Sequence, residues 1–93
     1  MKVAATSRST AVAGAIAHAI RESGETSVRA IGASAVNQAV KAVCYAREFL
    51  MEDEEPISIF CIPTFVKLEL DGEERTAVEL LIKQDESATD ESI

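Results

Sequence analysis

Two segments of the chain place apolar residues at helical spacing, and four shorter segments have the character of strands. The first helix ends near Glu22, and its predicted stripe consists of Val12, Ile16, Ala19 and Ile20. The second spans Ser34–Met51, and its predicted stripe consists of Val36, Val40, Val43 and Leu50, with Ala39 and Ala46 between them. The predicted strands are Lys2–Ala5, Thr26–Ile31, Ile57–Leu70 and Glu73–Lys83. This order, βαβαββ, predicts an α+β fold with two helices on one face of a mixed four-stranded sheet.

Turn and cap residues mark the ends of these elements. Ser7 or Ser9 is the expected N-cap of the first helix, because a hydroxyl accepts the free amides of a first turn. Gly24 suits the left-handed conformation at the helix end, and Gly32 ends the second strand. Gly14 lies inside the first helix, where glycine is unfavourable, so we expect a close approach by another element there.

The strand Ile57–Leu70 is apolar at consecutive positions, whereas a half-exposed strand should alternate. Pro63 within it indicates an edge strand or a bulge, and Asp71-Gly72 predicts a hairpin turn after it. If Phe60 and Ile62 face the helices, the open sheet face is formed by Ile57, Ile59, Cys61, Ala77 and Leu81. Such a patch favours a homodimer or higher oligomer. The alternative is a bulge near the proline that reverses the facing.

The 93 residues are enough for one domain, predicted over residues 1–83, followed by an acidic tail over 84–93 that we expect to be disordered. The net charge is −7 and is unevenly spread: residues 1–50 carry +3, 51–83 carry −6 and 84–93 carry −4. The chain contains no apolar run of membrane-spanning length and no signal-peptide pattern. We therefore expect a cytoplasmic protein that makes no membrane contact.

Catalytic chemistry has little support in the sequence. His18 is the only histidine and lies on the first helix without an evident partner. Cys44 and Cys61 fit no metal spacing, and the simplest interpretation is a pair of small buried thiols in a reducing compartment. No phosphate-loop spacing of glycines occurs. We expect no enzymatic activity, no metal and no cofactor.

An anion site is possible at the first strand-to-helix turn, Ser7-Arg8-Ser9-Thr10. Amides at a helix N-terminus favour negative charge, the hydroxyls add donors, and Arg8 adds a full positive charge. Plain N-capping with a solvated arginine is the alternative. Arg29 and Lys41 could extend a basic surface near this turn. The acidic run 52–55 is interpreted as a solvated linker.

Three stretches together carry a resemblance: AIGASAVNQAVKAV, CIPTF and DGEERTAVELLI. They resemble the bacterial stage V sporulation protein S family, over roughly Val3–Ile82. That resemblance implies an Alba-like fold, with strand order 1-2-4-3 and the last strand antiparallel. Alba-like proteins commonly pair through the third and fourth strands, which agrees with the expected dimer. The loop that carries lysines in Alba proteins offers only Arg8 here.

The resemblance also implies a function: a small regulatory protein of sporulation or development that binds DNA or RNA. The expected contacts are weak phosphate contacts at Ser7, Arg8, Ser9 and Thr10, extended by Arg29 and Lys41. The alternative is a protein–protein interaction module that binds no nucleic acid, using the apolar sheet face. A small phosphate ligand at the same turn is a third possibility, which the sequence does not separate from the first.

Overall fold

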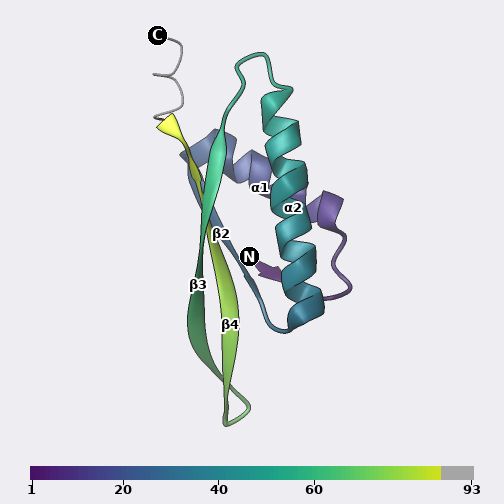
Figure 1. Cartoon of the computed structure of the whole chain (residues 1–93), viewed down its shortest axis with the longest axis vertical. Coiled ribbons are helices and arrows are strands. Elements are labelled where there is room, and N and C mark those ends of the chain that lie inside the picture. Colours follow the sequence, from purple (N-terminus) through teal and green to yellow (C-terminus); the bar gives the residue numbers. More distant parts are fainter. Residues whose placement is uncertain (87–93) are drawn as a thin grey trace.

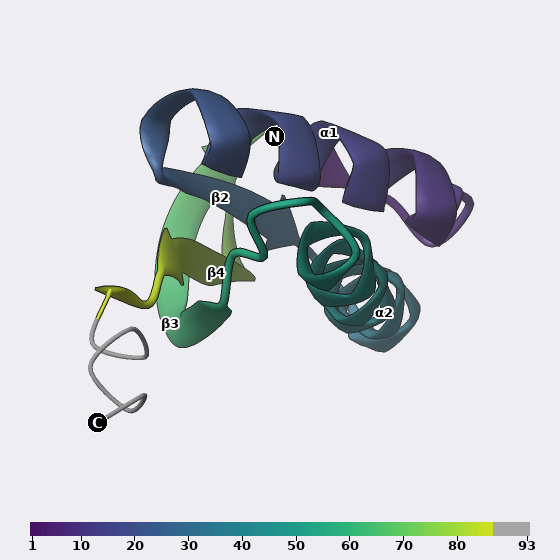
Figure 2. The ribbon, with the colours of Figure 1, turned by 90° about the horizontal axis from the view of Figure 1, so that it is seen from above.

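The chain forms the six expected elements in the expected order (Figure 1). A computed structural model describes residues 1–86. The elements are β1 (Lys2–Val3), α1 (Ser9–Ser23), β2 (Glu25–Ala30), α2 (Ala33–Met51), β3 (Ile59–Leu70) and β4 (Glu73–Gln84). The sheet order is β1-β2-β4-β3; β1 and β2 run parallel and the other neighbours antiparallel. Both helices lie on one face of the sheet (Figure 2), which confirms the predicted α+β fold.

The last strand runs one residue further than the sequence pattern predicts. Gln84 is paired with Ile59 of β3, and the Asp85 amide donates to the Ser58 carbonyl at 2.8 Å. The acidic tail predicted from residue 84 onward therefore begins inside the sheet. Residues 87–93, on which the rest of that prediction falls, lie outside the described part of the chain.

The core is built on alanines where the sequence pattern predicts valines. The buried residues of α2 are Ala35, Ala39, Ala42, Ala46 and Leu50. The predicted stripe is wrong at Val40, which is 46% exposed, while Val36 and Val43 pack only at the edge of the core. Because α1 and α2 pack against each other as well as against the sheet, small side chains let the two helices approach closely.

Two glycines end elements as predicted, and a third has no packing role. Gly24 closes α1 with φ 80°, and its amide donates to the Ile20 carbonyl at 2.8 Å. Gly32 has φ 89° at the start of α2. The expected close approach at Gly14 is wrong: this residue is exposed, and a side chain built there would meet nothing within 4 Å.

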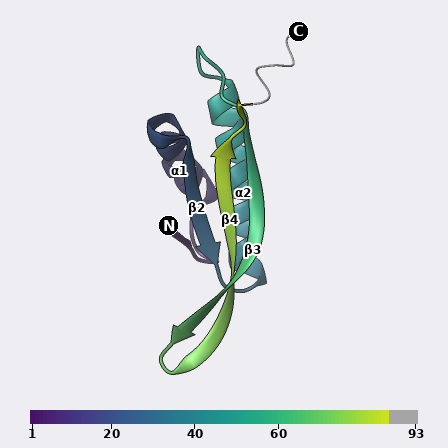
Figure 3. The same cartoon turned by 90° about the vertical axis from the view of Figure 1, so that its left-hand side faces the viewer.

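β3 and β4 extend well past the rest of the sheet. β4 pairs with β2 only as far as Val78, so residues 66–77 form a two-stranded ribbon, here called the hairpin arm. Its tip is the predicted Asp71-Gly72 turn, in which both residues have positive φ (52° and 77°), as a type I′ turn requires. The arm bends past the end of β2 toward the β1 edge of the sheet (Figure 3).

β3 is the outer strand of the sheet, as Pro63 predicts, but its facing is opposite to the prediction. Ile59 is 8% exposed and belongs to the core beneath the helices. Phe60 and Ile62, each 43% exposed, are turned to the open face instead. Register explains the reversal, because Cys61 pairs with the fully buried Ile82 and thus shares its side of the sheet.

The acidic loop after α2 is more than a solvated linker, because Asp53 joins it to α1. Arg21 donates from Nε and Nη2 to the two carboxylate oxygens of Asp53, each at 2.9 Å. This hydrogen bonding holds the pKa of Asp53 below its ordinary value and raises that of Arg21. Glu54 and Glu55, by contrast, are exposed at the end of the loop.

Candidate functional site

The turn between β1 and α1 is shaped by Ser7. The Ala4 amide donates to Ser7 Oγ at 2.8 Å, and the Ser7 amide donates back to the Ala4 carbonyl at 3.0 Å. The Ser7 hydroxyl is therefore engaged inside the turn, on the side away from the helix. The prediction that Ser7 or Ser9 caps α1 is wrong: the N-cap residue is Arg8, and Ser9 is already helical.

The first turn of α1 thus keeps its backbone donors available. No side-chain hydrogen bond caps this helix end. The first intrahelical bond runs from the Val12 amide to the Arg8 carbonyl at 3.0 Å, so the amides of Ser9, Thr10 and Ala11 precede it. Arg8 and Thr10 are exposed beside these amides. The helix dipole and the guanidinium together favour an anion here.

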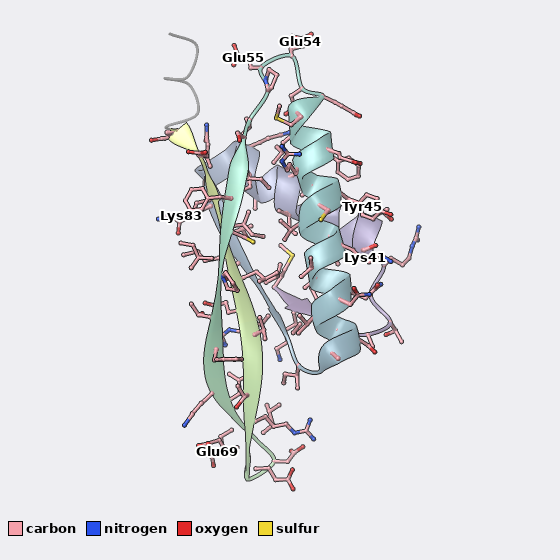
Figure 4. The ribbon with its side chains drawn as sticks, in the orientation of Figure 1. Lys41, Tyr45, Glu54, Glu55, Glu69 and Lys83 are labelled. Carbon is pink, nitrogen blue, oxygen red and sulfur yellow. The ribbon has the colours of Figure 1, made fainter. Side chains whose placement is uncertain are left out.

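Helix α2 supports this turn and adds a second cation. Gln38 Nε2 donates to the Ser7 carbonyl at 2.7 Å, in a partly buried contact that joins two segments 31 residues apart. Lys41 and Tyr45 follow at helical spacing and are both exposed. Figure 4 shows them on the side of α2 nearest the turn. Tyr45, 36% exposed, offers an aromatic face beside the cations.

Gln38 and Tyr45 are not among the predicted site residues. Tyr45 lies in an apolar segment, where a core position is the ordinary expectation. The available signal was the spacing of Gln38, Lys41 and Tyr45, which share one side of the helix with the polar Ser34 and not with the alanine stripe. The contact of Gln38 with Ser7 had no sequence signal, since it depends on how α2 packs against the turn.

Arg29 lies apart from the turn. It alternates with the buried Val28 and Ala30, so its side chain is on the open face of the sheet, away from the helices. There its Nε donates to Glu79 Oε2 at 2.7 Å, across the β2–β4 pair. The structure brings together Ser7, Arg8, Ser9, Thr10 and Lys41, whereas Arg29 is on the open sheet face and bound to Glu79.

The charges of the chain are divided between its parts. Residues 1–21 and 26–47 contain no acidic side chain, and their basic residues are Lys2, Arg8, Arg21, Arg29, Lys41 and Arg47. The acids concentrate in the loop after α2 and in the hairpin arm. The surroundings of the β1–α1 turn are consequently basic, although the whole chain is acidic.

The five residues proposed for the dimer interface do not form one surface. Ile59 and Ala77 are buried within the chain, at 8% and 0% exposure, and Ile57 packs against the core. Only Cys61 is fully exposed, and Leu81 is half-buried. The apolar side chains that do lie exposed on the open face of β3 are Phe60 and Ile62.

Other chemistry has little basis in the described residues. Cys44 and Cys61 are free and exposed, so the expectation of buried thiols is wrong. Cys44 lies on α2 opposite the alanine stripe, and Cys61 is on the outer strand. Within residues 1–86 no three histidine, cysteine or acidic side chains are grouped to hold a metal ion. None of the helices there is both long and apolar enough to cross a bilayer.

The chain matches the model of a known protein family. The model of the family described as stage V sporulation protein S matches residues 1–85. The match covers the β1–α1 turn, both helices and the whole hairpin arm.

Proposed function

The chain belongs to the sporulation-related stage V sporulation protein S family, and from that premise we propose that it is a cytoplasmic regulatory protein that binds nucleic acid through the β1–α1 turn. The observation that carries the proposal is the uncapped first turn of α1, flanked by Arg8 and supported through Gln38 by the helix that presents Lys41. Phosphate oxygens accept from the amides of Ser9, Thr10 and Ala11. Arg8 and Lys41 supply charge to neighbouring phosphates.

The binding is expected to be weak and sensitive to salt. Few cations take part, so a dissociation constant of about 10⁻⁴–10⁻⁶ M, that of non-specific complexes, is appropriate. Two phosphate contacts to duplex DNA give a log–log salt slope of about −1.8, or about a sevenfold loss of affinity between 50 and 150 mM salt. Tyr45 can stack on an unpaired base, which favours single strands over duplexes.

The test is fluorescence anisotropy with labelled single- and double-stranded oligonucleotides at both salt concentrations. The informative variants are Arg8→Glu and Lys41→Glu, and the matched control is Arg47→Glu, an exposed arginine on another side of α2. All three change the net charge equally. We expect both site variants to lose binding and the control to retain it. Equal losses in all three variants, or no binding by the wild type at 50 mM salt, would reject this site.

Self-association is a second candidate function, favoured by the exposure of β3. This outer strand exposes apolar side chains on both faces: Phe60 and Ile62 on the open face, and Phe65, 80% exposed, on the helix side. A strand that is apolar on both faces is typical of one covered on both faces. We propose that a second copy of the chain covers β3 in a homodimer.

Sedimentation equilibrium at micromolar concentration tests the dimer. Ile62→Lys should shift the mass toward that of the monomer, because it introduces a charge into the proposed interface. Thr76→Lys, an exposed position in the hairpin arm, is the control and should leave the mass unchanged. A wild-type protein that is monomeric throughout would exclude self-association through this strand.

A further inference from the structure

A cavity of about 540 Å³ lies at the carboxyl ends of the parallel strands β1 and β2. The first turn of α2 bounds it on one side, and the hairpin arm bounds it on another. The bend of the arm toward the β1 edge of the sheet is seen in Figure 3. Its volume is within the range of about 300–1,000 Å³ that is usual for small-molecule sites. Such sites often lie beyond the carboxyl ends of parallel strands, where loops and helix N-termini meet.

The walls of the cavity are mostly apolar. Leu68 and Leu70, on alternate positions of the arm, line it together with Ala4, Ala5 and Ile31. Leu70 is 41% exposed, so part of this wall is uncovered. Glu69 between the two leucines also lines the cavity, although alternation turns its side chain to the other face of the arm. Figure 4 shows it on the side away from the helices.

Two cations stand side by side at one edge of the cavity. Lys2 and Arg29 are register partners on β1 and β2 and therefore share a face of the sheet. Glu79 neutralises Arg29 and fixes its guanidinium through the Nε bond. Lys2 forms no ion pair within residues 1–86, so its ammonium group is available to a ligand at this edge.

We propose that this cavity binds a small organic anion with an apolar body. The anionic group, a carboxylate or a phosphate, lies against Lys2 and Arg29, and the apolar body lies against Leu68 and Leu70. The proposal goes beyond nucleic-acid binding: Ser7 of the β1–α1 turn lines the cavity, but the cations of that site, Arg8 and Lys41, do not. A ligand here touches the arm and the strand ends together, and would fix the position of the arm.

The test uses the anionic dye 8-anilino-1-naphthalenesulfonate, whose emission rises in an apolar site. Ala5→Trp fills the cavity from an exposed position, and Ala15→Trp places the same side chain on an exposed part of α1 outside it. We expect Ala5→Trp to raise the dissociation constant about tenfold or more, a loss of about 1.4 kcal/mol. Ala15→Trp should bind as the wild type does. Equal binding by both would put the dye elsewhere on the surface and overturn the proposal.

Charge is tested by Lys2→Gln with Lys67→Gln as the matched control on the arm. Removing one exposed cation should weaken dye binding about two- to fivefold. It should leave unchanged the binding of the uncharged analogue N-phenyl-1-naphthylamine. Competition by decanoate and by phenyl phosphate then separates carboxylate from phosphate ligands, and failure of both to displace the dye would overturn the proposal.

Two further measurements separate this site from the others. Ala5 lies in the β1–α1 turn itself, so nucleic-acid affinity is compared in Leu70→Ser, a cavity variant on the hairpin arm, in which it should equal that of the wild type. The sedimented mass should also be unchanged. A wild-type dimer that becomes a monomer in Ala5→Trp would mean that a second copy occupies the cavity, which contradicts the proposal.

Discussion

Enlarging one buried alanine of α2 tests the packing that positions the β1–α1 turn. Ala42 is 0% exposed and lies in the alanine stripe, one residue after Lys41. Ala42→Leu adds three carbon atoms to a layer in which α1, α2 and the sheet are in contact. The neighbouring backbones must separate, or the leucine must leave its preferred rotamers.

The expected cost is about 2 kcal/mol, the middle of the range of about 1–3 kcal/mol for overpacked cores. For a domain of this size that corresponds to a fall in melting temperature of about 8–16 °C. Ala15→Leu makes the same change at an exposed position of α1 and should be nearly neutral. Val40→Ala should also be nearly neutral, because Val40 is 46% exposed and alanine is the better helix former.

Urea unfolding followed by circular dichroism at 222 nm measures the three free energies of unfolding, provided that the slope with urea is unchanged. If Ala42→Leu is as stable as the wild type while Val40→Ala loses more than about 1 kcal/mol, the buried stripe consists of the valines. The helix would then be rotated about its axis. Lys41 would then no longer lie beside the turn. Both the described helix packing and the proposed nucleic-acid site would be wrong.

Two further predictions concern α1 and the contacts at its C-terminal end. Asp53→Asn should lower stability at neutral pH, because Arg21 holds the pKa of Asp53 below its ordinary value of 3.8. A carboxylate whose pKa is lowered in the folded state stabilises the fold above its unfolded-state pKa, and this stabilisation is lost as pH falls through the folded-state pKa. The free energies of unfolding of the wild type and of Asp53→Asn should therefore become equal in acid. A difference that persists in acid would show that the ion pair with Arg21 is not its cause. Gly14→Ala should stabilise α1 by about 0.5–1 kcal/mol, since space is open around it, whereas Gly24→Ala should destabilise by about 1 kcal/mol because φ is 80°. Thermal melts of the two variants should move in opposite directions.

The order of elements could be predicted because its signals are local. Gly24 and Asp71-Gly72 adopt the positive φ values for which such residues are selected, and each marks an element end without reference to the rest of the chain. The length and spacing of the apolar segments then suffice to separate helices from strands. Together these signals fix βαβαββ, and an N-terminal β-α-β unit sets the parallel pair.

The facing of elements was harder, because it depends on partners. Because valine is more apolar than alanine, the hydropathy pattern of α2 predicts that Val40 is buried. Close helix packing instead favours residues with small side chains at the buried positions, and Val40 is exposed. β3 is apolar at consecutive positions, so alternation does not show which of its residues face the helices. The register with β4 decides this, because Cys61 is paired with the buried Ile82 and lies on the same face of the sheet.

The candidate site was predicted in part for the same reason. Arg8 and Thr10 follow directly from the position of the helix start. Arg29 was included in the predicted site because of its charge alone. In the structure its guanidinium is bound to Glu79, a cross-strand partner 50 residues away in the sequence. Which cations are available to a ligand is thus a property of pairing in the sheet and could not come from local spacing.

The net charge of −7 argues against nucleic-acid binding only if charge acts over the whole molecule. The described chain is 52 Å long, and the acids lie mostly toward its two ends: Glu54 and Glu55 in the loop, Glu69 on the arm (Figure 4). At physiological salt a charge is screened over about 8 Å. A phosphate at the first turn of α1 is therefore governed by Arg8, Lys41 and the free amides. Under the proposed function, the distant acids act instead on the approach of a polyanion and would limit binding to short contacts at the turn.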